Sequence, residues 1–157
     1  MTTNDISPLR QYRQWIDQEL ATSPSPLGRW LRGTLLAADV DSCSVAYVVR
    51  PEMTNPAGIL HGGIMAAMLD DLIGITVHLA AGDTFFASVN LAIDYLAAAK
   101  VGDEVIARTR IVRRGKRIVN AEGTLELPNG TLLARATSNL AATPRFSMPP
   151  PAPVEEL

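Results

Sequence analysis

Residues 61–82, HGGIMAAMLDDLIGITVHLAAG, contain the longest apolar region of this 157-residue chain. The hydrophobic residues recur at helical spacing, which predicts one helix running to about Ala81 with a broad core face. Asp70, Asp71 and His78 interrupt the apolar run, so it falls short of the 18 or so uninterrupted apolar residues that indicate a membrane span. We therefore expect a long helix buried in a protein core. The predicted core face consists of Ile64, Met65, Met68, Leu69, Leu72, Ile75, Thr76 and Leu79.

The opposite side of this helix combines small residues with an acid. Asp70 lies among them, and a carboxylate on a small apolar face is costly to bury unless it is paired or hydrogen-bonded. Asp70 is therefore either a functional group or a solvent-exposed or ion-paired acid. Asp71 and His78, two turns apart, are expected to form a boundary or surface pair. The small residues of this side are Gly63, Ala66, Ala67, Gly74 and Val77.

The remaining segments predict an α+β protein with a mostly antiparallel six-stranded sheet wrapped around the long helix. A short helix is expected over residues 6–21. We expect residues 1–29 to be an N-terminal helix and linker, residues 30–143 the main domain, and residues 144–157 a disordered proline-rich tail. The expected strands are Trp30–Ala37, Cys43–Arg50, Phe85–Leu96, Glu104–Arg114, Arg117–Leu127 and Thr131–Thr143.

Composition narrows the functional classes. Hydrophobic residues make up 47% of the chain and charged residues only 19%, which suggests a second apolar surface against a partner subunit. The net charge of -2 argues against a nucleic-acid-binding surface. The single cysteine, Cys43, excludes an internal disulfide and a cysteine-based metal cluster. The first residues do not resemble a signal peptide, so a cytoplasmic location is expected.

The helix begins with His61-Gly62-Gly63, and paired glycines at this position are expected to leave backbone N–H groups free for a ligand. A helix N-terminus favours a developing oxyanion or a polarised carbonyl. Asp70 lies about two turns further along, about 12 Å by the rise per residue. That distance exceeds hydrogen-bond reach within one helix. A second copy of the helix, lying antiparallel, would bring the acid to the helix start.

Two stretches, NPAGILHGGIMAAMLDD and SVNLAIDYLAAAKVGDEVIARTRIVRRGKR, resemble the hotdog-fold acyl-CoA thioesterases. The resemblance is strongest to the phenylacetate-pathway and thioesterase-superfamily-member-2 type, and it covers about residues 30–143. It implies hydrolysis of an acyl- or aryl-CoA thioester to the free acid and CoA. It also implies a homodimer with edge-joined sheets, often a homotetramer, and an active site between subunits.

The resemblance also implies roles for individual residues. Asp70 matches the catalytic acid, acting as general base on water or as nucleophile, and Gly62 N–H matches the oxyanion donor. Asn55 and His61 match the pair that positions the water and the thioester. Ser88 matches a strand hydroxyl near the acid. Asn55, His61 and Gly62 are expected from one subunit, with the acid and the serine from the other.

A basic turn follows further along the chain, at Arg113, Arg114, Lys116 and Arg117. Such a run is commonly a solvated hairpin tip. The resemblance implies instead that it contacts the phosphates of coenzyme A, with Gly63 also touching the substrate. No metal or separate cofactor is expected, because a thiolate is a good leaving group and CoA is part of the substrate.

Alternatives remain at this level. Hotdog hydratases or dehydratases also act on thioesters with a histidine and an acid, and a non-catalytic acyl-CoA-binding protein would share the same pocket. If the helix were rotated by one residue, Asp71 would replace Asp70 in the site. The identity of the acyl group is not encoded in any motif.

Overall fold

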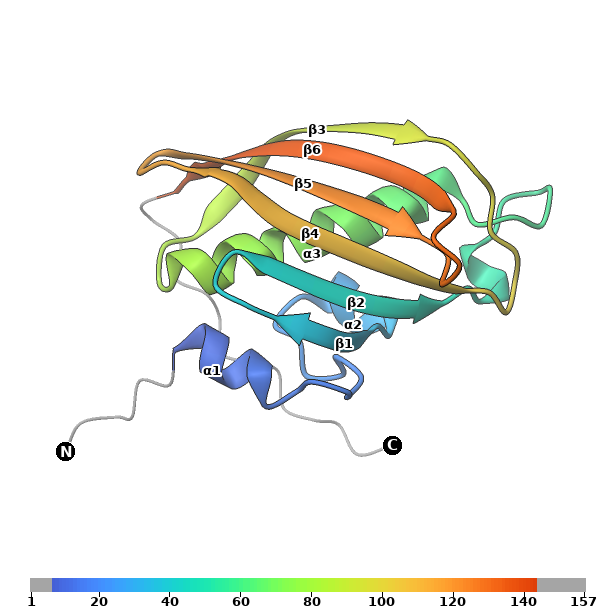
Figure 1. Ribbon diagram of the computed structural model, residues 1–157, viewed down its shortest axis with the longest axis horizontal. Helices are drawn as coiled ribbons and strands as arrows, with labels where there is room; N and C mark the ends of the chain where they lie inside the picture. Colours follow the sequence, from blue (N-terminus) through green and yellow to red (C-terminus); the bar gives the residue numbers. More distant parts are fainter. Residues whose placement is uncertain (1–6, 144–157) are drawn as a thin grey trace.

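Three α-helices and six β-strands follow one another along residues 7–143, the part of the chain that the computed structural model describes (Figure 1). The proline-rich tail expected over residues 144–157 lies outside this part. The elements in chain order are α1 (Pro8–Arg13), α2 (Pro26–Leu31), β1 (Thr34–Ala38), β2 (Ser42–Val48), the short 3₁₀ helix η1 (Pro51–Met53), α3 (Gly62–Ala81), β3 (Phe86–Tyr95), β4 (Glu104–Arg114), β5 (Ile118–Glu126) and β6 (Leu132–Ala142).

The six strands form one antiparallel sheet in the order β1-β2-β4-β5-β6-β3. Tight connections join β4 to β5 and β5 to β6, as the turn residues predict. The chain passes from β2 to β3 through α3, so β3 lies at one edge of the sheet and β1 at the other. This confirms the predicted six-stranded fold.

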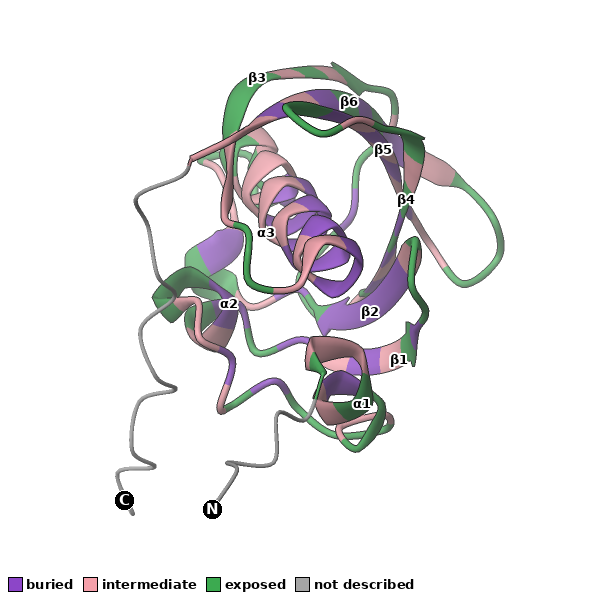
Figure 2. Ribbon diagram, turned by 90° about the vertical axis from the view of Figure 1, so that its left-hand side faces the viewer, coloured by how far each residue is buried: buried purple, intermediate pink, exposed green. Residues whose placement is uncertain are grey.

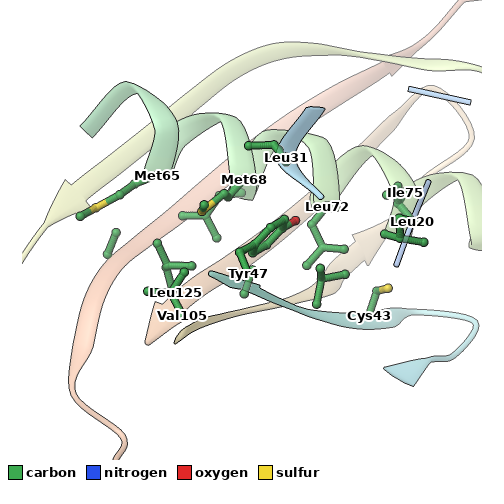
Figure 3. Close-up of a cluster of buried hydrophobic side chains, with 14 of the residues drawn as sticks. Leu20, Leu31, Cys43, Tyr47, Met65, Met68, Leu72, Ile75, Val105 and Leu125 are labelled. Carbon is green, nitrogen blue, oxygen red and sulfur yellow. The ribbon is translucent and has the colours of Figure 1, made fainter. Parts of the chain in front are cut away.

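The curved sheet wraps around α3, whose inner face packs on the strands (Figure 2). In Figure 3, Met65, Met68, Leu72 and Ile75 extend from α3 toward strand residues such as Tyr47. All of the predicted core-face residues are buried except Ile64, which is partly buried. Although α3 is long and apolar enough to cross a membrane, this packing makes it the core helix.

One assignment on the opposite side of α3 is wrong. Val77, expected on the small open face, is buried together with Ile73 in a second apolar cluster. That cluster forms because β5 and β6 pass over the C-terminal half of α3. Strand β5 contributes Val119 and Ala121, and β6 contributes Leu140. The remaining small residues of this side, with Asp70, are only partly buried or exposed.

The N-terminal segment differs from the single helix that its spacing predicts. Helix α1 stops at Arg13, and the chain then turns and forms an isolated antiparallel bridge from Glu19 to Thr34. Buried Tyr12 and Leu20 join the core cluster. The segment is therefore packed onto the domain rather than trailing from it.

Helix α2 occupies residues that the pattern assigns to a linker and to the start of a strand, and it spans the expected boundary between residues 29 and 30. Ser25 caps it by accepting a hydrogen bond from Gly28 N–H, and Pro26 follows at the first helical position. Strand β1 begins only at Thr34 because Arg32 ends α2 in the left-handed conformation, with φ of 56°.

Candidate active site

An acid–hydroxyl pair lies between α3 and the edge strand β3. The Ser88 hydroxyl donates a hydrogen bond of 3.0 Å to Asp70 Oδ1. Asp70 lies on the side of α3 that the sheet leaves partly open, and Ser88 precedes a bulge in the pairing of β3 with β6. The predicted proximity of these two residues is therefore confirmed.

The start of α3 leaves one backbone donor free. His61 is the N-cap, and its Nδ1 accepts a hydrogen bond of 2.9 Å from Gly63 N–H. The His61 carbonyl accepts from Ile64 and Met65 N–H. Within residues 7–143, Gly62 N–H has no acceptor. The helix start therefore offers the Gly62 donor, whereas the expectation of a free Gly63 N–H is wrong because the histidine cap uses it.

The loop before the helix is organised by Asn55. Its Oδ1 accepts from Ala57 N–H at 2.9 Å, while His61 N–H donates to the Met53 carbonyl. Because the side-chain oxygen of Asn55 is used inside this turn, its amide NH₂ is the part left to contact a ligand. Asn55 and His61 therefore share one rigid loop that leads into Gly62.

A tyrosine that the sequence does not single out lies over this helix start. A Cβ atom placed on Gly62 would lie 3.2 Å from both Cε1 and Cζ of Tyr95, the last residue of β3. The lack of a side chain at Gly62 therefore lets the ring approach the first turn of α3. No sequence signal marks Tyr95, because the contact joins two distant elements.

The neighbouring acid, Asp71, points elsewhere. The Ser25 hydroxyl donates to Asp71 Oδ1 at 2.6 Å. Burial raises the pKa of Asp71, and the hydrogen bond from Ser25 opposes that shift. Asp71 and His78, expected as a boundary or surface pair, are both half-buried and line the same cavity. The boundary position is therefore confirmed, and the surface position is wrong because the N-terminal segment covers this part of α3. Asp70, which contacts Ser88, is therefore the better candidate for the catalytic acid.

A cavity of about 540 Å³ extends from the Asp70–Ser88 pair along α3. Its walls come from four parts of the chain: α3, the segment leading into and starting β3, the N-terminal segment, and β6. His78 lines it toward the C-terminal part of α3, and burial lowers the pKa of that imidazole. Apolar walls include Ile75, Phe86 and Leu140, and Tyr12, Ser25 and Asp71 contribute polar groups.

The basic turn between β4 and β5 lies at the other end of α3. A guanidinium nitrogen of Arg114 donates to the Ala80 carbonyl in the last turn of the helix. Arg114 therefore caps α3 rather than standing free, in contrast to the role implied by the resemblance. Arg113, Lys116 and Arg117 are exposed, and their side chains have no hydrogen bond or ion pair to any residue from 7 to 143.

The distance between the start of α3 and the acid matters for assembly. Gly62 and Asp70 are eight residues apart on one continuous helix, or about 12 Å. The acid and the free N–H of one chain are thus too far apart to act on the same carbonyl. In the described part of the chain, no three His, Cys, Asp or Glu residues gather in a metal-binding arrangement.

Comparison with known proteins gives consistent results. The family model described as the thioesterase superfamily matches residues 57–134. Human acyl-coenzyme A thioesterase 13 is 28% identical over 114 residues, covering 73% of this chain and 76% of that protein.

Two solved structures are similar in both fold and sequence. A phenylacetic acid degradation-related protein from Ralstonia eutropha has 32% identity and a TM-score of 0.70, covering 76% of this chain and 92% of that one. Mouse thioesterase superfamily member 2 has 27% identity and a TM-score of 0.67, covering 73% of this chain and 84% of that one.

A long central helix wrapped by one antiparallel sheet is the hotdog fold, which this chain shares with these thioesterase structures. The chain belongs to the thioesterase superfamily, and it is a thioesterase.

Proposed function

We propose that this thioesterase hydrolyses an acyl- or aryl-CoA thioester to the free acid and CoA, at a site shared between two copies of the chain. One observation carries the proposal. Asp70, which is bonded to Ser88 of β3, and the free Gly62 N–H lie on one helix, separated by about 12 Å along its axis. A carbonyl bonded to Gly62 N–H is out of reach of Asp70 in the same copy, so a second copy must supply the acid.

The edge strand β3 is the surface through which two copies join. It borders the sheet over ten residues, and Val89 on it is 64% exposed. An open edge of this length can pair with another strand. Antiparallel pairing of two β3 strands continues the sheet and places two α3 helices antiparallel beneath it. Two such dimers then associate as a tetramer.

In this dimer, one copy supplies Asn55, His61 and Gly62, and Asp70 and Ser88 come from the other. Gly62 N–H donates to the thioester carbonyl oxygen, which becomes negative as the bond to carbon forms. The His61 side chain holds the first turn of the helix through its bond to Gly63 N–H.

The acid at position 70 acts in one of two ways. As general base, it takes a proton from water while the water oxygen bonds to the carbonyl carbon. The tetrahedral intermediate then collapses, the C–S bond breaks, and the CoA thiolate leaves and takes up a proton. As nucleophile, the carboxylate attacks the carbonyl carbon itself, the C–S bond breaks, and the CoA thiolate leaves and takes up a proton. Water then hydrolyses the resulting anhydride, which releases the free acid and restores the carboxylate. Ser88 stabilises the carboxylate in either case.

Coenzyme A is proposed as the thiol because the exposed cations of the basic turn suit its phosphates. Arg113 and Arg117 offer bidentate donors, and Lys116 adds a point charge. The turn lies at the C-terminal end of α3 in its own copy, as the Arg114 contact requires. In an antiparallel pair of helices, that end is near the Gly62 end of the partner helix. The name of the human relative also agrees with an acyl-CoA substrate.

Thiol release from a panel of acyl- and aryl-CoA thioesters tests the activity. We expect hydrolysis by the wild type and a strong loss in Asp70→Asn, with Asp83→Asn, an exposed acid beyond α3, unchanged. Hydration of an enoyl-CoA without thiol release would indicate a hydratase instead. Binding of CoA esters without either reaction would indicate a binding protein.

Subunit mixing tests the shared site. Asp70→Asn subunits are mixed with subunits carrying Asn55→Ala and His61→Ala, each inactive alone. A heterodimer then holds one intact site of two, so random exchange at equal amounts restores about a quarter of wild-type activity. If the mixture has almost no activity although mass spectrometry shows that subunits have exchanged, the whole site lies in one subunit.

A further inference from the structure

The cavity beside the catalytic acid contains a second carboxyl group, Asp71, that the proposed reaction does not use. It follows Asp70 on α3 and is rotated by about 100° around the helix axis. Its Oδ1 accepts the Ser25 hydroxyl hydrogen bond at 2.6 Å. Ser25 is in turn held by Gly28 N–H at 3.0 Å as the cap of α2. The N-terminal segment therefore fixes the orientation of this carboxyl group.

The other oxygen, Oδ2, accepts no hydrogen bond from the described part of the chain. Ser25 is the only hydrogen-bond partner of Asp71 among residues 7–143. Over the same residues, no fully buried side-chain oxygen or nitrogen lacks a partner. Oδ2 must therefore keep some accessible surface, and Asp71 lines the cavity that begins at Asp70.

A glycine keeps this oxygen accessible. A Cβ atom on Gly28 would lie 2.8 Å from Oδ2, closer than two such atoms can approach. Any side chain at position 28 would therefore push the carboxyl group aside or cover it. The same Cβ atom would lie 3.1 Å from Ser23 Oγ and 3.3 Å from Ser25 Cβ, but its shortest contact is with Oδ2. The backbone of Gly28 is helical and needs no special φ value.

The Asp71 carboxyl group lies in a cavity whose other walls are largely apolar. Ile75, Phe86 and Leu140 make much of the cavity apolar. A purely hydrocarbon acyl group would bind more tightly beside an apolar side chain at position 71. A hydrocarbon placed against the carboxyl group would remove water from an oxygen that has no other hydrogen bond, and that desolvation costs free energy. Asp71 is half-buried, and this burial raises the pKa of its carboxyl group.

We propose that Asp71 is a specificity-determining residue of the acyl pocket: its Oδ2 accepts a hydrogen bond from a hydroxyl group on the acyl chain. The enzyme then prefers hydroxylated acyl thioesters over unsubstituted ones of the same length. Asp71 contacts the acyl group and not the reacting atoms. This inference rests on the proposed thioesterase function, because it takes the cavity that begins at Asp70 as the acyl pocket.

Matched thioesters test the preference. The kcat/KM of hexanoyl-CoA is compared with that of its 3-, 4-, 5- and 6-hydroxy forms, and 3-phenylpropanoyl-CoA is compared with its ring-hydroxylated forms. In the wild type, we expect at least one hydroxylated form to exceed its parent by about ten-fold, the value of one hydrogen bond to a carboxyl group. Wild-type enzyme that prefers every parent compound, or does not distinguish them, overturns the proposal.

Two variants connect the preference to this carboxyl group. Asp71→Leu is expected to reduce the hydroxyl advantage to less than three-fold while retaining or raising kcat/KM for the parent compounds. Gly28→Ala keeps the Asp71 carboxyl group but crowds its Oδ2, so it is also expected to reduce the preference for hydroxylated thioesters. This variant replaces Asp71→Leu in the test if Asp71→Leu does not fold. An advantage that persists in folded Asp71→Leu, or in Gly28→Ala when Asp71→Leu does not fold, overturns the proposal.

A control separates recognition from general loosening. Asp39→Asn removes the ion pair with Arg13, another contact of the N-terminal segment that lies outside this cavity. The hydroxyl advantage should be unchanged in this variant. A wild type that hydrolyses no thioester refutes the thioesterase function and the inference together. Hydrolysis without hydroxyl preference refutes only the inference.

Discussion

The Ser88 hydroxyl lies 3.0 Å from Asp70 Oδ1 and joins the edge strand to the central helix. Because the serine donates to one carboxylate oxygen, it fixes the direction of the acid. We expect Asp70→Asn to lower kcat by about 10²- to 10⁴-fold, as for loss of a general base. Ser88→Ala removes one hydrogen bond and should cost roughly ten-fold.

Steady-state thioester hydrolysis measures both effects, and thermal unfolding shows whether each variant is folded. Ser88→Thr keeps a hydroxyl and is expected to recover part of the loss. Equal activity of Ser88→Ala and wild type would show that the contact does not matter for catalysis.

Two glycines should respond to alanine in opposite ways. At Gly33, a Cβ atom would lie 2.3 Å from Val45 Cγ1 and 2.6 Å from Tyr47 Cε1, both in the buried core. Gly33→Ala is expected to destabilise the fold by about 3 kcal/mol through overpacking. At Gly74, no atom lies within 4 Å of the Cβ position, so Gly74→Ala should stabilise α3 by about 0.5–1 kcal/mol.

Urea unfolding of both variants measures the difference. Gly74 also lines the cavity, so activity is a second observable. A stable but less active Gly74→Ala would indicate that a bound acyl group needs the space of the missing side chain. Similar stability of Gly33→Ala and wild type would contradict the close packing of Gly33 against Val45 and Tyr47 of β2.

Local patterns predicted most of the fold. The helical spacing of residues 61–82 corresponds to α3, and β4 has the predicted bounds, Glu104–Arg114. In both cases, one face of the element is buried and the pattern is dictated by that face. The pattern assigns the start of α2 to the linker within residues 1–29, although Ser25-Pro26 supplies the same N-cap and first-turn proline as Ser7-Pro8 does for α1.

The site was predictable in part. Asp70 and Ser88 are close, and His61 caps the helix. The sequence offers no indication that Gly63 N–H is used by His61, since this depends on the side-chain conformation. The environment of Asp71 was also not predictable, because the segment that covers it comes from a distant part of the chain.

The cations of the basic turn are expected to have two different roles, one in stability and one in substrate binding. Arg114 bonds to the Ala80 carbonyl, so Arg114→Ala is expected to cost about 0.5–1 kcal/mol of stability through the loss of a cation at a helix C-terminus. Arg113→Ala, Lys116→Ala and Arg117→Ala should leave stability unchanged and raise KM for CoA thioesters. The increase in KM should shrink as salt is added, since salt screens phosphate attraction.

Denaturant unfolding and kinetics at low and high salt distinguish the two groups. The acyl chain of the substrate is held constant, so a change in KM reports on the coenzyme A part. Unchanged KM in the triple variant Arg113→Ala, Lys116→Ala, Arg117→Ala would place the phosphates elsewhere.

The buried acid predicts how stability depends on pH. The pKa of Asp71 is raised above its ordinary value of 3.8 because burial disfavours the charged carboxylate. The folded state therefore keeps this proton at pH values where the unfolded state has lost it. By linkage, its contribution to the free energy of unfolding falls as pH rises from about 3.8 through the folded-state pKa, and is constant above it.

Asp71→Asn removes this titration and nearly preserves the shape of the side chain. The difference in free energy of unfolding, wild type minus Asp71→Asn, should therefore decrease between pH 4 and pH 7 in urea titrations. His78 has the opposite trend, because burial lowers its pKa and stability is lost below its ordinary value of 6.5. Asp71 is not among the causes of that shift, so the His78 contribution cancels in the difference. A difference that is flat or that rises with pH would show that the Ser25 hydrogen bond outweighs burial at Asp71.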